Sequence, residues 1–223
     1  LHKAIRRQRQ MCIRDSYTAK GTRTLRSYTV TYNKGSYISS VSRTSESVSY
    51  GSNAAGSTAT VMANTAQYSY AFDGWYNGST RVSTALTYAP TNITGALTLE
   101  ARATRMTRRY TATIGVDSSC TGRCQVGSGS TVWTSSFSET VNYGDKINLQ
   151  CKLLNSGDVF AGWYENETLL STNLTYPITV TSNRNIVAKV WFIDVSPTSL
   201  SYEASGGSKT VTVKSNIPSW SVS

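Results

Sequence analysis

Histidine, proline and charge are scarce in this chain of 223 residues, which has one histidine, four prolines and 15% charged residues. The single imidazole, His2, lies at the very start. The rest of the chain therefore has no base for a Ser-His-Asp or Cys-His arrangement and no histidine for a mixed zinc site. No apolar run approaches the 18 or more residues of a membrane-spanning helix. These absences argue against histidine-based catalysis, a zinc cofactor and insertion of this chain into a membrane.

Paired carboxylates could still support hydrolysis, but the acidic residues are spread through expected strand ends and turns. A phosphate-binding glycine loop is lacking too, because Gly127-Ser-Gly129 is followed by a strand-like run and not by a helix. We therefore predict that the chain is not an enzyme and holds no cofactor or metal. The scattered acids are Asp73, Glu100, Asp117, Glu139, Asp145, Asp158, Glu165, Glu167 and Asp194.

The most informative feature that is present is a duplication. Residues 72–88 and 160–176 are identical at 10 of 17 aligned positions, where ordinary composition would give about one or two. Both copies contain Gly-Trp-Tyr and end in Leu-Thr-Tyr. In a repeat protein the repeated residues are those that each copy needs to fold. The predicted core residues are accordingly Phe72, Trp75, Phe160 and Trp163.

The composition favours a mainly β fold. Ser, Thr, Tyr, Val and Gly dominate, as in short strands joined by Gly, Asn and Ser turns. Alternating apolar and polar residues predict strands at 28–32, 59–63, 70–75 and 97–101, with partners at 146–151 and 185–190. At about 80 residues, each unit can bury a modest core.

The strongly basic character of the chain comes from its N-terminal end. Residues 1–27 carry 8 Lys and Arg against one Asp, so the net charge of +10 falls to +3 for residues 28–223. Residues 1–16 do not fit the repeat pattern, and we expect them to be a non-native leader. The remaining basic run, Arg102, Arg105, Arg108 and Arg109, is interpreted as a solvated linker. No nucleic-acid partner is expected, because phosphate binding needs basic residues clustered on one face.

Two copies of a pattern over residues 28–192 resemble the internalin-type B-repeat, also called the Listeria-Bacteroides repeat. The pattern comprises Tyr-Thr-Val-Thr-Tyr, Val-Ser-Tyr-Gly, Phe-Asp-Gly-Trp-Tyr and Leu-Glu-Ala-Arg in the first copy. The resemblance implies compact β-grasp-like modules strung along bacterial surface proteins. We expect module boundaries at 28–105 and 106–192, with residues 17–27 as the end of a truncated upstream repeat.

Residues 193–223 have a different pattern, with Pro197, a Gly206-Gly207 turn, a Thr-Val-Thr-Val strand and Trp220. They resemble the start of a BACON-type domain, an immunoglobulin-like module common on surface and glycan-degrading proteins of Bacteroidetes. Such a sandwich needs about 100 residues. The resemblance therefore predicts an incomplete immunoglobulin-like β-sandwich after the tandem modules.

The chain has four cysteines. Cys12 falls in the expected leader, which leaves Cys120, Cys124 and Cys151 in the second copy. Three thiols without histidine are a poor metal site, and the extracellular context of the family favours a disulfide. Cys120 and Cys124 could bridge to each other, or one of them to Cys151. Counting back without gaps from the shared Phe places Cys151 opposite Ala63.

Aromatic residues that differ between the copies are the candidates for ligand contact, because they are more often exposed and aromatic faces stack on sugars. They are Tyr37, Tyr68, Trp133 and Phe137. Two functions remain open. The first is a non-catalytic spacer and adhesive display region of a cell-surface or secreted protein. The second is a carbohydrate-binding accessory region of a glycan-degrading or glycan-capturing protein. Expected partners are glycans or host and cell-surface proteins, and the expected location is extracellular or at the cell surface.

Overall fold

The computed structural model describes residues 22, 24–129 and 132–221, so the expected leader at 1–16 lies outside the described residues. The described part of the chain contains eighteen strands, one short 3-10 turn and no α-helix. The prediction of a mainly β fold is confirmed.

Eight strands form what we call module 1. They are β1 (Ser27–Lys34), β2 (Ile38–Val41), β3 (Ser45–Ser49), β4 (Ser57–Val61), β5 (Tyr68–Asn77), β6 (Thr80–Ser83), β7 (Thr87–Tyr88) and β8 (Leu97–Thr107). A five-stranded sheet has the order β3-β1-β8-β5-β6, and a three-stranded sheet has the order β2-β4-β7. In the larger sheet the first and last strands, β1 and β8, pair in parallel at its centre.

Module 2 repeats this topology strand by strand. It contains β9 (Arg109–Val116), the 3-10 turn η1 (Ser118–Cys120), β10 (Cys124–Gly127), β11 (Ser136–Asn142), β12 (Lys146–Leu153), β13 (Val159–Glu165), β14 (Thr168–Ser171), β15 (Thr175–Thr179) and β16 (Arg184–Trp191). Its sheets have the orders β11-β9-β16-β13-β14 and β10-β12-β15, with β9 and β16 parallel. The duplication seen in the sequence is therefore a duplication of the whole fold.

Each core lies between the two sheets of its module. In β1 the side chains of Val30 and Tyr32 are buried while Thr29 and Asn33 are exposed, as alternation along a strand requires. In module 2 the side chains of Ile114, Leu149 and Ile186 fill the same space from three different strands. The apolar residues of both sheets thus meet in one cluster per module.

The glycine of the repeated Gly-Trp-Tyr motif bends its strand. The pairing of β5 with β8 shifts between Phe72 and Gly74, and that of β13 with β16 shifts between Phe160 and Gly162. Such a β-bulge brings residues three apart onto one face. The rings of Phe160 and Trp163 accordingly meet edge to face at 5.5 Å in the core of module 2.

Both motif tryptophans are fully buried, at 0% exposure. The indole N–H of Trp75 donates to the carbonyl oxygen of Leu86 at 3.1 Å, and that of Trp163 donates to Asn173 at 3.0 Å. A repeated serine precedes each of these acceptors. The hydroxyl of Ser83 accepts the backbone N–H of Ala85, and the hydroxyl of Ser171 accepts that of Asn173. The repeated residues therefore close one turn around one indole in each module.

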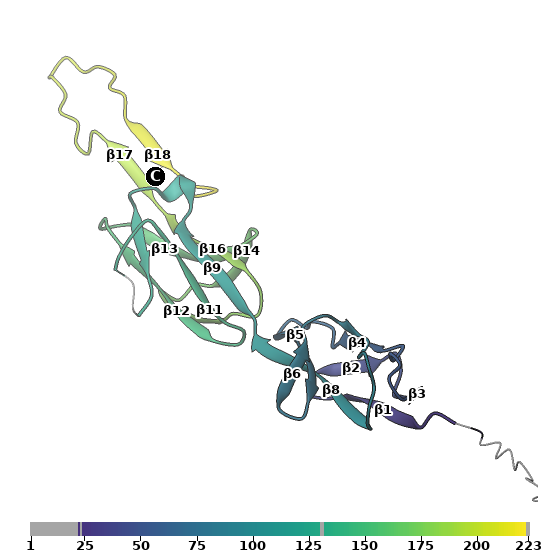
Figure 1. The fold of residues 1–223 in the computed structure, drawn as a ribbon. Coiled ribbons are helices and arrows are strands. Elements are labelled where there is room, and N and C mark those ends of the chain that lie inside the picture. Colours follow the sequence, from purple (N-terminus) through teal and green to yellow (C-terminus); the bar gives the residue numbers. More distant parts are fainter. Residues whose placement is uncertain (1–21, 23, 130–131, 222–223) are drawn as a thin grey trace, which may run out of the picture.

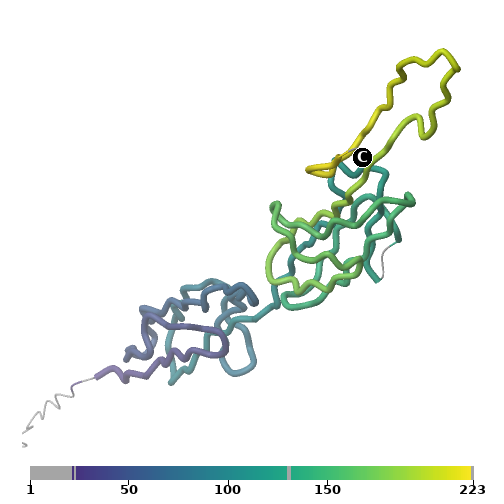
Figure 2. Tube along the Cα trace, turned by 180° about the vertical axis from the view of Figure 1, so that it is seen from behind, coloured from purple at the N-terminus to yellow at the C-terminus, as the bar shows by residue number. Residues whose placement is uncertain are grey.

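The modules lie end to end, so the described chain is elongated (Figure 1 and Figure 2). After module 2 the chain forms a two-stranded hairpin of β17 (Ile193–Ser196) and β18 (Thr212–Ser215), which extends beyond it along the same direction.

Candidate functional site

The junction between the modules is one residue long, because β8 ends at Thr107 and β9 begins at Arg109. The interpretation of the four arginines as a linker is wrong, although Arg105, Arg108 and Arg109 are exposed to solvent as expected. Arg102 and Arg105 lie within β8, where alternation points them to opposite faces of the sheet. Arg102 forms an ion pair with Glu100 at 2.9 Å on one face.

Hydrogen bonds cross this junction and link the two modules. The backbone N–H of Arg108 donates to Gln67 at 2.9 Å, and its guanidinium donates to the carbonyl oxygen of Thr65 at 3.1 Å. The hydroxyl of Tyr110, on β9 of module 2, donates to Ala66 at 2.6 Å. Residues 65–67 of module 1 thus accept three bonds from the segment that enters module 2.

The segment that reaches the junction is longer in module 1 than in module 2. Cys151 and Ala59 hold equivalent positions, since each donates its N–H to a repeated leucine, Leu174 or Leu86. From there to the shared Phe, module 1 has four more residues. The gapless comparison of Cys151 with Ala63 is therefore wrong by these four residues. Sequence reasoning missed the junction contacts. The difference in length between the two copies is the signal in the sequence that could have pointed to them.

An aromatic and basic cluster lies on the same extension of β5 and β8. Arg105 lies over the ring of Tyr68 at 4.3 Å and over that of Tyr37 at 5.3 Å, and Tyr37 and Tyr70 are 5.6 Å apart. We call Tyr37, Tyr68, Tyr70 and Arg105 the tyrosine cluster. Two of the four predicted ligand residues, Tyr37 and Tyr68, are thus brought together, and both are half-buried.

The other two predicted ligand residues lie in module 2, apart from this cluster. Trp133 is 38% exposed and lies between β10 and β11, in a connection longer than its counterpart in module 1. Phe137 is half-buried and packs against the core of module 2. The structure does not bring Trp133 or Phe137 to the tyrosine cluster.

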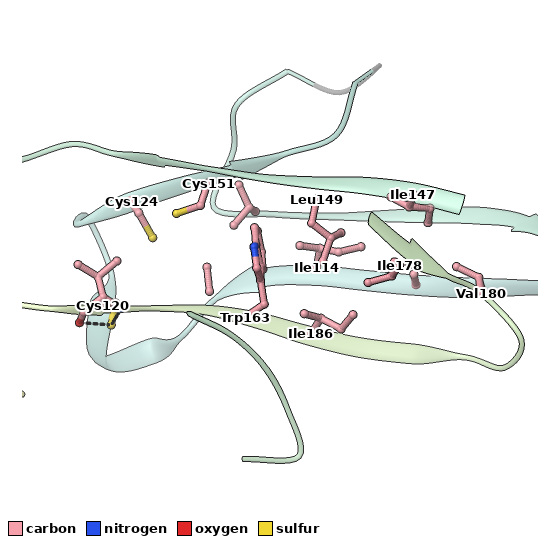
Figure 3. Packing of buried hydrophobic residues seen from close by; sticks show 14 residues of the cluster. Ile114, Cys120, Cys124, Ile147, Leu149, Cys151, Trp163, Ile178, Val180 and Ile186 are labelled. Atoms are coloured by element: carbon pink, nitrogen blue, oxygen red, sulfur yellow. Dashed lines mark hydrogen bonds between the residues drawn. The ribbon is translucent and has the colours of Figure 1, made fainter. Parts of the chain in front are cut away.

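The three cysteines of module 2 are buried and free, and they fall into two groups. Cys120 exchanges hydrogen bonds of 3.3 Å with the backbone N–H and carbonyl oxygen of Val190. The interaction between the side chains of Cys124 on β10 and Cys151 on β12 lowers the pKa of Cys124 and raises that of Cys151. Figure 3 shows the sulfur atoms of this pair turned toward each other, with Cys120 apart from them.

A half-buried carboxylate organises module 1. Glu46 accepts the hydroxyl of Tyr32 at 2.7 Å and the backbone N–H groups of Ala55 and Gly56 at 3.0 and 2.9 Å. Burial opposes its charge, but these bonds outweigh the burial and lower the pKa of Glu46. The same contact, with burial as the larger cause, raises the pKa of Tyr32.

We expect module 1 to lose stability in acid through Glu46. Because the pKa of Glu46 is lowered by folding, its contribution is complete above the unfolded value of about 4.3 and is lost as the pH falls through the folded value. Glu46→Gln should lower the urea midpoint of module 1 at pH 7 and flatten its decline between pH 5 and 3. The transition of module 2 in the same sample serves as control. Equal acid slopes with and without the substitution would contradict this role.

The C-terminal hairpin of β17 and β18 is joined to module 2 by an ion pair and by side-chain hydrogen bonds. Arg123 forms an ion pair with Asp158 at 3.2 Å within module 2, and it also pairs with Asp194 on β17. The amide of Asn216 donates to the carbonyl oxygen of Val190 at 2.6 Å and accepts from the N–H of Phe192 at 2.9 Å. The direction of the hairpin is therefore set by contacts with module 2.

The described residues contain no group of three or more His, Cys, Asp or Glu side chains placed to hold a metal ion. Within the same part of the chain, no helix is long and apolar enough to cross a membrane. Several of the scattered acids form ion pairs with basic side chains, such as Asp73 with Arg81 and Glu165 with Arg184.

The sequence was compared with known families and proteins. Residues 28–102 and 127–189, which make up more than half of the chain, match the Listeria-Bacteroides repeat domain. No curated protein matches the chain. The two matched segments coincide with most of modules 1 and 2, and β9 extends the second copy of the fold to Arg109. The chain therefore belongs to the Listeria-Bacteroides repeat domain family.

Proposed function

We propose that this chain is a non-catalytic spacer that presents other parts of a bacterial cell-surface or secreted protein in a set direction. The observation that carries the proposal is the junction, where a one-residue connection is held by three hydrogen bonds to residues 65–67. A flexible tether would instead have a longer stretch rich in Gly and Ser. The family match supports the surface location, since this repeat resembles modules of bacterial surface proteins.

The buried parts of each module support a structural role. The repeated motif residues close the turn around each tryptophan, and each tryptophan is a fully buried member of the core cluster of its module. Adhesion to host or cell-surface proteins would then arise from weak contacts multiplied along an array of modules. For residues 193–223, the BACON-type assignment is a further proposal, supported by the sequence pattern and by the β17–β18 hairpin.

Breaking the junction bonds is expected to free the modules without unfolding them. Tyr110→Phe combined with Arg108→Ala removes two side-chain bonds to residues 65–66, while both cores stay intact. Surface changes of this kind cost within about 0.5 kcal/mol. Residual dipolar couplings should fit one common alignment tensor in the unaltered chain and two different tensors in the double variant.

Arg109→Ala is the matched control, because Arg109 lies at the same junction but donates to Thr140 within module 2. It should keep the common tensor. Two independent tensors in the unaltered chain would contradict an oriented spacer and indicate a flexible string of modules.

The tyrosine cluster favours a second candidate, a carbohydrate-binding accessory region. Half-buried aromatic rings beside an arginine can stack on sugars and accept or donate polar contacts at their edge. A glycan array followed by calorimetry on the chain separates the two functions. The spacer proposal expects single-glycan binding no tighter than about 1 mM, or −4 kcal/mol. Micromolar binding that Tyr68→Ala abolishes and Trp133→Ala does not would establish the second candidate at this cluster.

A further inference from the structure

We propose that Cys124 and Cys151 are an oxidation site that forms a disulfide in module 2, while Cys120 remains a free thiol. The inference is independent of the spacer function and rests on the placement of the two strands. β10 and β12 are antiparallel neighbours, with Cys124 opposite Leu153 and Cys151 opposite Val126. The two cysteines are therefore diagonal neighbours two positions apart, and both are buried on the core face.

The sulfur atoms of Cys124 and Cys151 are turned toward each other in the core of module 2 (Figure 3). The interaction between the two side chains shifts their pKa values in opposite directions. A bond between them requires their backbones to approach, since diagonal Cα atoms lie about 7 to 8 Å apart and a disulfide prefers at most about 6.8 Å. β10 can make this movement, because it is only four residues long and is the edge strand of its sheet.

The equivalent positions in module 1 are occupied by apolar residues. Ala59 is paired with Val41 just as Cys151 is paired with Val126, and Ile38 holds the place of Cys124. An apolar pair in one copy is thus replaced in the other by two cysteines whose sulfur atoms are turned toward each other. A single cysteine in a core is a small apolar residue, but two at touching positions can share a covalent bond.

Cys120 has a different environment. Its sulfur is bonded to the backbone of Val190 on β16 and lies 3.5 Å from the side-chain nitrogen of Asn216. A bridge to Cys124 or Cys151 would break these bonds at the contact between module 2 and the hairpin. The alternatives that the sequence left open are therefore narrowed to one pair.

The oxidant is a low-molecular-weight disulfide such as oxidised glutathione. The thiolate of Cys124 attacks one sulfur of this molecule and releases the other as a thiol, which leaves a mixed disulfide on Cys124. The thiolate of Cys151 then attacks the Cys124 sulfur and releases the second thiol. Two protein thiols and one small disulfide thus become one protein disulfide and two small thiols. The lowered pKa of Cys124 favours it as the first nucleophile.

The test uses the full chain with Cys12→Ser in every sample, refolded in a mixture of oxidised and reduced glutathione. Alkylation in denaturant without reductant, followed by peptide mass mapping, should show a peptide that links Cys124 to Cys151. Cys120 should be the one alkylated cysteine. On heating, reductant should lower the transition of module 2 by about 10 °C or more and leave that of module 1 unchanged.

Two variants keep the result interpretable. Cys124→Ile with Cys151→Ala installs the apolar pair of module 1, and its melting should no longer respond to reductant. Cys120→Ala should still respond as the parent does. Three alkylated cysteines in the refolded chain, or a mapped bridge that contains Cys120, would overturn the proposal. These outcomes are read by mass and hold even if the double variant folds poorly.

Discussion

Trp75→Ala is expected to unfold module 1 while module 2 stays folded, and Trp163→Ala is expected to do the reverse. Each indole is 0% exposed and fills the centre of its core, so its removal should cost about 3 to 5 kcal/mol. The substitution also removes the indole hydrogen bond in each module, to Asn173 in module 2 and to Leu86 in module 1, where Leu86 keeps the N–H of Ala59. A unit of about 80 residues has little stability to spare.

Differential scanning calorimetry on each variant should show one transition at its usual temperature and the other shifted down or missing. Trp133→Ala is the control, because Trp133 is 38% exposed and its removal should cost less than about 0.5 kcal/mol. A cost below about 1 kcal/mol for Trp75 or Trp163 would show that the indole is not a core residue. Loss of both transitions at once would show that the modules fold as one unit.

Gly74→Ala should destabilise module 1 by on the order of 3 kcal/mol, the second largest effect expected here. Gly74 has φ of +151°, and a Cβ built on it would lie 2.5 Å from the carbonyl oxygen of Ser83 on the neighbouring strand. That oxygen belongs to the β5–β6 pairing, so it cannot move without opening the sheet edge. The bulge that brings Phe72 and Trp75 onto one face would be strained.

Gly95→Ala is the matched control for this substitution. A Cβ at Gly95 meets nothing within 4 Å, so the variant should be neutral to within about 0.5 kcal/mol. Chemical denaturation of module 1 in the two variants provides the comparison. Equal stability of Gly74→Ala and Gly95→Ala would mean that the bulge accommodates a Cβ without strain. The presence of glycine at this place in both copies would then need another explanation.

The strands and the core could be predicted because their determinants are local. Alternating residues in segments such as β1 and β12 set which side chains point inward, and the repeated Gly-Trp-Tyr marks the bulge at the same place in both copies. A period of two along a strand needs no knowledge of the partner strand. The family resemblance follows from the same local patterns, and it is confirmed for the Listeria-Bacteroides repeat.

The candidate sites depended on contacts between residues far apart along the chain. Tyr37 meets Arg105 because the parallel pairing of β1 and β8 brings the two ends of module 1 together. The four arginines resemble a linker in the sequence because composition does not reveal that β8 continues to within one residue of β9. Counting without gaps failed for Cys151 because the extra residues of module 1 serve the junction and lie outside the core.

The amino-acid sequence by itself determined that this is a duplicated, mainly β chain with a single histidine, because periodicity, motif identity and composition are properties of the chain alone. The tertiary structure decided which partners meet across that chain: residues 65–67 with Arg108 and Tyr110, and Cys124 with Cys151. Strand order and register place these groups together. Strand order and register are set when the apolar faces of both sheets of a module are buried together, and no local stretch of residues encodes this.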